Sequence, residues 1–307
     1  MRASFIRTLT EVANDDPRVM LLTGDLGFMA IEPFSEAFPD RFLNIGVAEQ
    51  NMVGVASGLA EAGYIPFCYS IAPFATLRPY EFIRNGPVHH RLPVRIVGVG
   101  GGFEYGTAGP SHHAIEDIAV MRALPGMTVV APADAPQTVT ALRATWDLKG
   151  PVYYRIGKDE RTVIPGLDAR FSLGHAETLR PGEDMLIITT GSISVEAVAA
   201  ADLLNAEGVS AGVMTVASIE PAPVDDLVGA MAGVRAVVTL EAHVLAGGLG
   251  TLVAEIIAER GLGCRLRRIA VSNGACPQVG STAHLHQVHG LSANHVIGTA
   301  RLLLAST

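Results

Sequence analysis

The chain has 307 residues, of which 49% are hydrophobic and only 17% are charged, so composition indicates a well-buried globular protein and excludes a disordered one. The formal net charge of −8, without a basic patch interleaved with aromatic residues, argues against non-specific nucleic-acid binding. No apolar run approaches the roughly 20 residues of a membrane-spanning helix, and the first residues lack the continuous apolar core of a signal peptide.

The three cysteines, Cys68, Cys264 and Cys276, form no CxxC pair. A sparse and odd number of cysteines is typical of a reduced cytoplasm, which is the location we expect. We interpret these thiols as structural rather than catalytic.

The first half of the chain alternates between β-rich runs and longer helical runs. In chain order we expect a helix at 2–14, a strand at 19–25, a helix at 47–63, a strand at 65–70, a helix at 76–85, a strand at 94–100, a helix from about 114, a strand at 127–133, a helix at 134–148 and a strand at 151–157. Apolar strands separated by helical crossovers predict a parallel sheet covered on both faces.

A Pro- and Gly-containing stretch with little periodicity, 161–183, reads as a linker. A second block of the same kind follows, with strands at 184–191, 210–216, 235–241 and 265–271 and helices at 192–207, 222–232, 247–260 and 292–305. The predicted fold class is therefore α/β, with two consecutive parallel-sheet, three-layer domains at 1–160 and 184–307.

Ligands of open α/β sheets collect beyond the carboxyl ends of the strands, so polar residues just after strands are candidates for a site. Asp25 follows the first strand, Glu49 lies early in the next helix, and the glycine-rich loop 98–113 ends in His112 and His113. Asp25 could equally be a turn or capping residue, and Glu49 a first-turn carboxylate favoured by the helix dipole. The loop could be no more than a flexible connection.

Gly24 and Asp25, with Asn51 downstream, imitate the GDG…N motif that binds Mg²⁺ and diphosphate in thiamin diphosphate enzymes. The third position is Leu26, whose side chain would obstruct the close approach of the backbone to a diphosphate. We predict no metal site at Asp25 or elsewhere in this chain.

Three stretches of the first half resemble the pyrimidine-binding domain of transketolases and 1-deoxyxylulose-5-phosphate synthases: NIGVAEQNMVGVASGLAEAG, GPSHHAIEDIAVMRALPGMTVVAPAD and GPVYYRIGK. Two stretches of the second half, LIITTGS and TLEAHVLAGGLG, together with the terminal helix, resemble the C-terminal domain of that family. The resemblance covers nearly the whole chain. The order of the AEQN helix, the GPSHH loop and the GGLG segment makes it specific.

The resemblance implies the C-terminal subunit of a split transketolase, because the family's diphosphate-binding domain has no counterpart here. A separate N-terminal subunit with the GDG…N motif would then hold the diphosphate of thiamin diphosphate and its Mg²⁺ (or Ca²⁺), in an α2β2 heterotetramer. Gly54 and Gly58 would allow close helix packing at the subunit interface, with packing inside the chain as the alternative.

The resemblance also implies roles for individual residues. Glu49 would be the activating carboxyl, because a buried carboxyl can share a proton with the weakly basic ring nitrogen N1′ of the aminopyrimidine. The other residues expected near the cofactor are Phe74, Asp25, Ile71 and Leu77, with plain core packing as the alternative for the last two. His112 would contact substrate hydroxyls as a second catalytic residue, and Arg155 would bind a sugar phosphate or else form an ordinary ion pair.

The chain departs from the family pattern in the substrate loop. Two residues before the proline of the GPSHH loop, the family has an acidic residue that recognises a substrate hydroxyl, and this chain has Ala108. A histidine that contacts the substrate phosphate in the family is replaced by Gly100 or a neighbour. Both losses put the usual sugar-phosphate substrates in question, and the polar residues left to set selectivity are Glu104, Tyr105 and His113.

The function implied is transfer of a two-carbon ketol or acyl unit from a ketose or 2-oxoacid donor to an aldehyde acceptor. One alternative is the β-subunit of a 2-oxoacid dehydrogenase-type E1 enzyme, which has the same pair of domains. The other is a non-catalytic, regulatory subunit that keeps the fold. No nucleic acid or membrane partner is expected.

Overall fold

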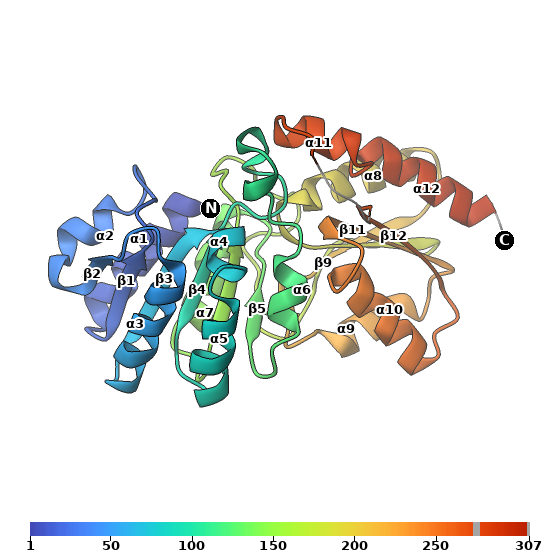
Figure 1. The fold of residues 1–307 in the computed structure, drawn as a ribbon. Coiled ribbons are helices and arrows are strands. Elements are labelled where there is room, and N and C mark those ends of the chain that lie inside the picture. The colour runs from blue at the N-terminus through green and yellow to red at the C-terminus, as the bar shows by residue number, and fades with distance from the viewer. Residues whose placement is uncertain (273–276, 306–307) are drawn as a thin grey trace.

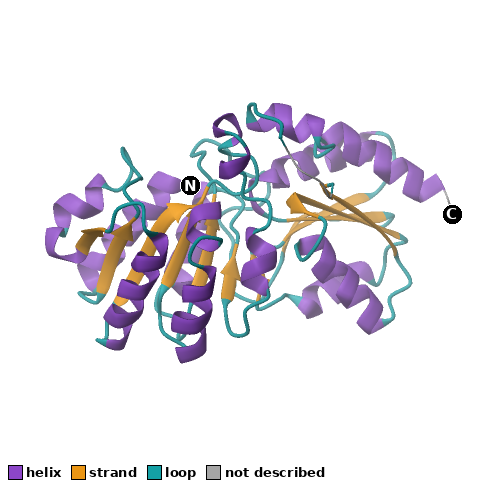
Figure 2. Cartoon of the chain, viewed as in Figure 1, coloured by secondary structure: helices purple, strands orange, loops and turns teal. Residues whose placement is uncertain are grey.

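Two β-sheets, each covered by helices on both faces, lie side by side in the computed structural model, which describes residues 1–272 and 277–305 (Figures 1 and 2). Cys276 falls outside the described residues, and the other two cysteines are free thiols. Among the residues described, no helix combines the length and the apolar character needed to cross a membrane.

The first sheet has seven strands in the order β10-β5-β6-β4-β3-β1-β2. Its strands are β1 (Val19–Thr23), β2 (Phe42–Asn44), β3 (Ile65–Ile71), β4 (Arg95–Val99), β5 (Thr128–Val130), β6 (Val152–Ile156) and β10 (Ser218–Glu220). All neighbouring pairs are parallel except β10 with β5. The carboxyl ends of β1, β3, β4 and β6 therefore meet at one edge, where a site is expected.

Helices cover both faces of this sheet. They are α1 (Arg2–Asp15), α2 (Glu32–Ala37), α3 (Glu49–Glu61), α4 (Ala72–Thr76), α5 (Tyr80–Ile83), α6 (Asp117–Arg122) and α7 (Ala135–Thr145). The apolar side chains of α1 and α7 join one core cluster, and those of α3, α5 and α6 join another. The expected helix at 76–85 is instead divided between α4 and α5, because Pro79 has no backbone N–H to continue α4.

The second sheet has five strands in the order β12-β11-β8-β9-β7. Its strands are β7 (Glu177–Arg180), β8 (Met185–Thr189), β9 (Ala211–Thr215), β11 (Ala236–Val244) and β12 (Arg265–Val271), and its helices are α8 (Ser194–Ala206), α9 (Val224–Met231), α10 (Leu249–Arg260), α11 (Thr282–Val288) and α12 (Ala293–Ala305). Side chains of α8 and α12 pack on one face, and those of α9 and α10 pack on the other.

The two-domain α/β prediction is confirmed, with two differences at the sheet edges. Residues 177–180, inside the stretch expected to be a linker, form β7 and pair antiparallel to β9. Residues 218–220 leave the second block and pair antiparallel with β5 of the first sheet. Both segments cover the exposed edge of a sheet, and a short edge strand carries too little periodicity to be recognised in the sequence.

One apolar core joins the two halves. It combines side chains under the first sheet, such as Ile96 and Met121, with side chains of the second, such as Leu186, Val216 and Leu249. Because α6 packs into this shared cluster, the loop 98–114 is held between the two sheets.

Candidate functional site

Glu49 is a buried carboxyl at the carboxyl edge of the first sheet. It is the first residue of α3 and its side chain is only 1% exposed. Gly24, just after β1, lies against it, since a Cβ atom at Gly24 would be 3.3 Å from Glu49 Oε1. Glu49 is thus a first-turn carboxylate, as the alternative reading expected, and it is also buried, while its contact with a cofactor stays a prediction.

Two side chains donate hydrogen bonds to the Glu49 carboxylate. Ser70 Oγ, at the end of β3, donates to Oε1 at 3.0 Å, and Arg78 Nη1 donates to Oε1 and Oε2 at 3.1 and 2.9 Å. A charge buried this deeply needs such a partner, because its unpaired ionised form would be strongly disfavoured. Arg78 itself is 38% exposed, so it forms the solvent side of the pair.

Phe74 and His112 stand beside this pair. Phe74 is on α4 and half-buried, and its ring lies 4.9 Å from the His112 ring in an edge-to-face arrangement. The guanidinium carbon of Arg78 lies 3.8 Å from the centroid of the Phe74 ring. Glu49, Phe74 and His112, which the sequence analysis proposed separately, thus come together through Arg78 and Phe74.

The remaining residues expected around the cofactor take different positions. Ile71 is half-buried at the end of β3, and Leu77 is 45% exposed just after α4. Asp25 is exposed in a turn with φ of 57°, and its carboxylate accepts a hydrogen bond from the Asn44 side chain at 2.9 Å. The geometry of Asp25 is that of a turn residue, and its contact with a cofactor stays a prediction.

The glycine-rich loop after β4 is shaped by one aromatic side chain. Gly100 has φ of +80°, and a Cβ atom there would lie 2.2 Å from the Tyr105 ring. Tyr105 in turn lies 6.3 Å from the His112 ring and carries Lys158 over its face at 4.8 Å. Burial raises the pKa of the Tyr105 hydroxyl. Gly100 is thus a position where only glycine leaves room for the loop to fold back.

Glu104 and His113 are both held by contacts with other parts of the protein. Glu104 accepts a hydrogen bond from Ser192 Oγ at 2.8 Å and another from the backbone N–H of Lys158, and burial raises its pKa. His113 is buried, with its ring edge-on to Phe103 at 5.1 Å, and burial lowers its pKa. The structure shows a contact with the second domain for Glu104 and packing on Phe103 for His113, and substrate binding by these two residues stays a prediction.

Arg155 is enclosed as well. Its Nε donates to Asp117 Oδ2 at 2.7 Å, and its Nη2 donates to the carbonyls of Ala114 and Ala242 at 2.9 and 3.0 Å. The side chains of Arg155 and Asp117 are 6% and 1% exposed. The ion-pair alternative for Arg155 is present in the structure, while its binding of a sugar phosphate stays a prediction.

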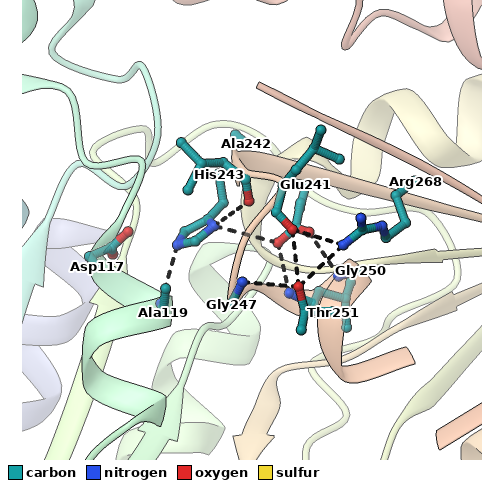
Figure 3. Close-up of polar contacts among 12 residues, drawn as sticks. Asp117, Ala119, Glu241, Ala242, His243, Gly247, Gly250, Thr251 and Arg268 are labelled. Carbon is teal, nitrogen blue, oxygen red and sulfur yellow. Dashed lines mark hydrogen bonds and ion pairs between the residues drawn. The ribbon is translucent and has the colours of Figure 1, made fainter. Parts of the chain in front are cut away.

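A second buried cluster explains the GGLG segment (Figure 3). The carboxylate of Glu241 accepts hydrogen bonds from the backbone N–H groups of Leu249 and Gly250 at 2.7 and 2.8 Å, at the start of α10. His243 Nε2 accepts from the backbone N–H of Ala119 on α6 at 3.2 Å. Burial raises the pKa of Glu241. Glu241 and His243, both on β11, therefore anchor the starts of α10 and α6 to this strand.

Sequence reasoning missed Arg78, Ser70, Asp117, Glu241 and His243. Arg78 follows Phe74 by four residues and Ser70 ends a strand, so position alone could have marked them as neighbours of a site. Nothing in the sequence shows that Asp117 faces Arg155, because the two are brought together only by the packing of α6 against β6.

The loops at the carboxyl edge of the first sheet expose apolar side chains. Large hydrophobic side chains are exposed after β1, before α3 and after α4: Phe28, Met29, Val47 and Leu77. A Cβ atom at Gly54 or Gly58 would have nothing within 4 Å, so packing inside the chain does not explain these two glycines. In the described ranges, no three His, Cys, Asp or Glu side chains are grouped to hold a metal ion.

The arrangement fits one half of a thiamin diphosphate site. The Glu49 carboxyl and the Phe74 ring both contact the flat guanidinium of Arg78, and the same two groups could hold a flat, nitrogen-containing ring in its place.

Comparisons with known proteins agree with this geometry. Residues 1–162 match the transketolase pyrimidine binding domain, and residues 174–296 match the transketolase C-terminal domain. The chain is 38% identical to a putative transketolase C-terminal section of Methanocaldococcus jannaschii, over 96% of this chain and 93% of that protein. It is 35% identical to a 6-deoxy-6-sulfo-D-fructose transketolase subunit of Clostridium sp. strain MSTE9, over 98% of this chain and 93% of that subunit.

A solved structure, described as a split-gene transketolase in an inactive β4 tetramer, superposes with a TM-score of 0.87 at 36% identity, covering 99% of this chain and 97% of that one. The likeness extends through both domains. The chain therefore belongs to the transketolase family and joins its pyrimidine-binding domain to its C-terminal domain.

Proposed function

We propose that this chain is the C-terminal subunit of a thiamin-diphosphate-dependent, transketolase-like enzyme. The reaction would move a two-carbon ketol or acyl unit from a ketose or 2-oxoacid donor to an aldehyde acceptor. Thiamin diphosphate supplies the carbon nucleophile that cleaves the bond beside the donor carbonyl. The observation that carries the proposal is the buried Glu49 carboxyl beside Phe74 and His112, at the carboxyl edge of the first sheet.

Glu49 and Phe74 would hold the aminopyrimidine. The Phe74 ring would offer a face for stacking, and the carboxyl of Glu49, which Arg78 links to that ring, would share a proton with N1′. Burial of this carboxyl excludes water that would otherwise compete for that proton.

His112 would meet the substrate. Its Nδ1 lies 3.0 Å from Ser111 Oγ, which leaves Nε2 as the ring nitrogen that can contact a substrate oxygen. Asp25, Ile71 and Leu77 would line the cofactor side, and Tyr105 the substrate side.

A partner subunit would complete the site. The relatives compared above are named as a C-terminal section and a subunit, and the chain spans 93% of each. We expect the partner to carry GDG…N and to hold the diphosphate and Mg²⁺ (or Ca²⁺), in an α2β2 heterotetramer. The exposed apolar side chains around Glu49, and the open faces of Gly54 and Gly58, support docking at this edge.

The test is reconstitution with the co-expressed N-terminal subunit, thiamin diphosphate and Mg²⁺, followed by donor cleavage on a panel of ketoses and 2-oxoacids. We expect turnover from the complex and none from this chain alone. Glu49→Gln should lower kcat about 10²–10⁴-fold in the complex, because the amide cannot share a proton with N1′. The matched control is Glu61→Gln, an exposed carboxyl at the other end of α3, which should retain kcat.

Strong activity of the chain without a partner would disprove the split-subunit arrangement. Near-normal kcat in Glu49→Gln would remove Glu49 from the mechanism. A correctly assembled complex that cleaves no donor across the panel would favour the non-catalytic, regulatory alternative.

A further inference from the structure

We infer that Arg78 occupies, in the free chain, the place of the cofactor's aminopyrimidine and must leave before thiamin diphosphate binds. The inference rests on the proposed function, because it concerns the same Glu49 site. It assigns to Arg78 an autoinhibitory contact that keeps the isolated subunit closed.

Arg78 makes both contacts that the aminopyrimidine would make. Its Nη1 lies 2.9 Å and 3.1 Å from the two carboxylate oxygens of Glu49, and its guanidinium carbon lies 3.8 Å from the centroid of the Phe74 ring. A guanidinium is flat, carries N–H donors and stacks on aromatic faces, as an aminopyrimidine does. Each contact is at van der Waals or hydrogen-bond distance, so no second ring fits between Arg78 and either partner.

The exposed fractions of the two side chains show which one a ligand entering from solvent meets first. Glu49 is 1% exposed and Arg78 is 38% exposed, so the guanidinium lies on the solvent side of the carboxylate. A ligand that arrives from solvent meets Arg78 first. Arg78 lies between α4 and α5, next to Pro79, and is therefore outside a continuous helix that would fix its direction.

The chemistry of the pair also separates the closed state from the active one. In the free chain the hydrogen bonds from Arg78 Nη1 occupy both carboxylate oxygens of Glu49. Activation requires one of these oxygens to face N1′ of the aminopyrimidine. Departure of Arg78 would therefore open the ring site and free the Glu49 carboxyl in one step.

The first test is the affinity of the assembled enzyme for thiamin diphosphate, measured by isothermal titration calorimetry in Mg²⁺. Arg78→Gln should bind the cofactor about tenfold more tightly than the wild type, because the competing charged hydrogen bonds are removed. Arg78→Lys, which keeps the charge but not the flat fork, should bind about threefold more tightly. The control is Arg84→Gln, an exposed arginine whose side chain donates to Asn85 Oδ1, and it should leave the dissociation constant unchanged.

The second test uses thermal unfolding of the free chain and needs no cofactor. Arg78→Gln should lower the Tm, because it removes the positive charge paired with the buried Glu49 carboxylate. In a Glu49→Gln background the same change should have little effect. A coupling of this kind shows that Arg78 acts on Glu49 and not on the fold in general.

Equal or weaker binding of thiamin diphosphate by Arg78→Gln would overturn the inference while leaving the proposed function intact. If Arg78→Gln does not assemble with the partner subunit, the affinity of Arg78→Lys for thiamin diphosphate is used instead. Equal or weaker binding by Arg78→Lys would then overturn the inference. A wild-type complex that does not bind thiamin diphosphate at all would overturn the proposed function, and the inference with it.

Discussion

At the scale of single residues, the Arg155 side chain is held by contacts with other residues of the protein. Its guanidinium joins three segments, because Asp117 begins α6, Ala114 ends the glycine-rich loop and Ala242 is on β11. Tyr153 also donates a hydrogen bond to Asp117, from its hydroxyl to Oδ2 at 2.6 Å. Asp117 is thus the shared acceptor that fixes the loop carrying His112.

Replacing Asp117 with Asn should destabilise the chain by about 3 kcal/mol, because the buried Arg155 would lose its counter-charge. Urea denaturation of the free chain measures this change. The exposed Asp40→Asn is the control and should shift the free energy of unfolding by less than about 0.5 kcal/mol. An unchanged stability accompanied by weaker substrate binding would instead indicate that Arg155 serves a ligand, as the family resemblance implies.

At the scale of elements, the start of α10 is fixed by the carboxylate of Glu241 and by the absence of a side chain at Gly248. A Cβ atom there would lie 2.1 Å from Glu241 Oε2 and 2.7 Å from His243 Nδ1. The φ of Gly248 is −84°, so the requirement for glycine is space and not backbone conformation. The GGLG segment therefore serves the packing of α10 against β11.

Gly248→Ala should cost about 2–3 kcal/mol of folding free energy, through displacement of Glu241 from the N–H groups of α10. The matched control is Gly298→Ala on α12, where a Cβ atom would meet nothing within 4 Å. That substitution should be neutral or stabilising by up to about 1 kcal/mol, since alanine favours a helix. Equal effects of the two substitutions in chemical denaturation would contradict the assigned role of Gly248.

At the scale of the whole molecule, a cluster of histidines around Phe103 connects the substrate loop of the first domain to α11 of the second. Phe103 contacts the rings of His113, His286 and His289 at centroid distances of 5.1, 6.3 and 5.0 Å. Burial lowers the pKa of all three and brings that of His286 to about 4. The folded chain therefore holds these rings neutral across the joint between the domains.

Their contribution to stability is complete above the ordinary histidine pKa of about 6.5 and is lost as the pH falls from there toward about 4, since unfolded histidines then bind protons more readily. The raised pKa values of Glu104 and Glu241 act in the opposite direction, so the test compares variants. Between pH 7 and 5, His286→Gln should lose about 1–2 kcal/mol less stability than the wild type.

Thermal unfolding at the two pH values measures the difference, with His284→Gln, an exposed histidine on the same helix, as the control. The same acid response in wild type and His286→Gln would exclude His286 as a source of acid sensitivity.

The sequence by itself determined the two α/β domains, the candidate Glu49 and the loop that ends in His112. Strand and helix periods are local, and the carboxyl ends of parallel strands necessarily share one edge of a sheet. The order of motifs along the chain was enough to suggest the family.

The tertiary structure alone decided what those residues touch. Arg78 covers Glu49, Asp117 holds Arg155, and Glu104 turns to Ser192 across 88 positions of sequence. Segments 177–180 and 218–220 became edge strands only because open sheet edges were present to pair with them. Such contacts join residues far apart in the chain, so they depend on the packed geometry of both sheets, to which no local pattern of residue types corresponds.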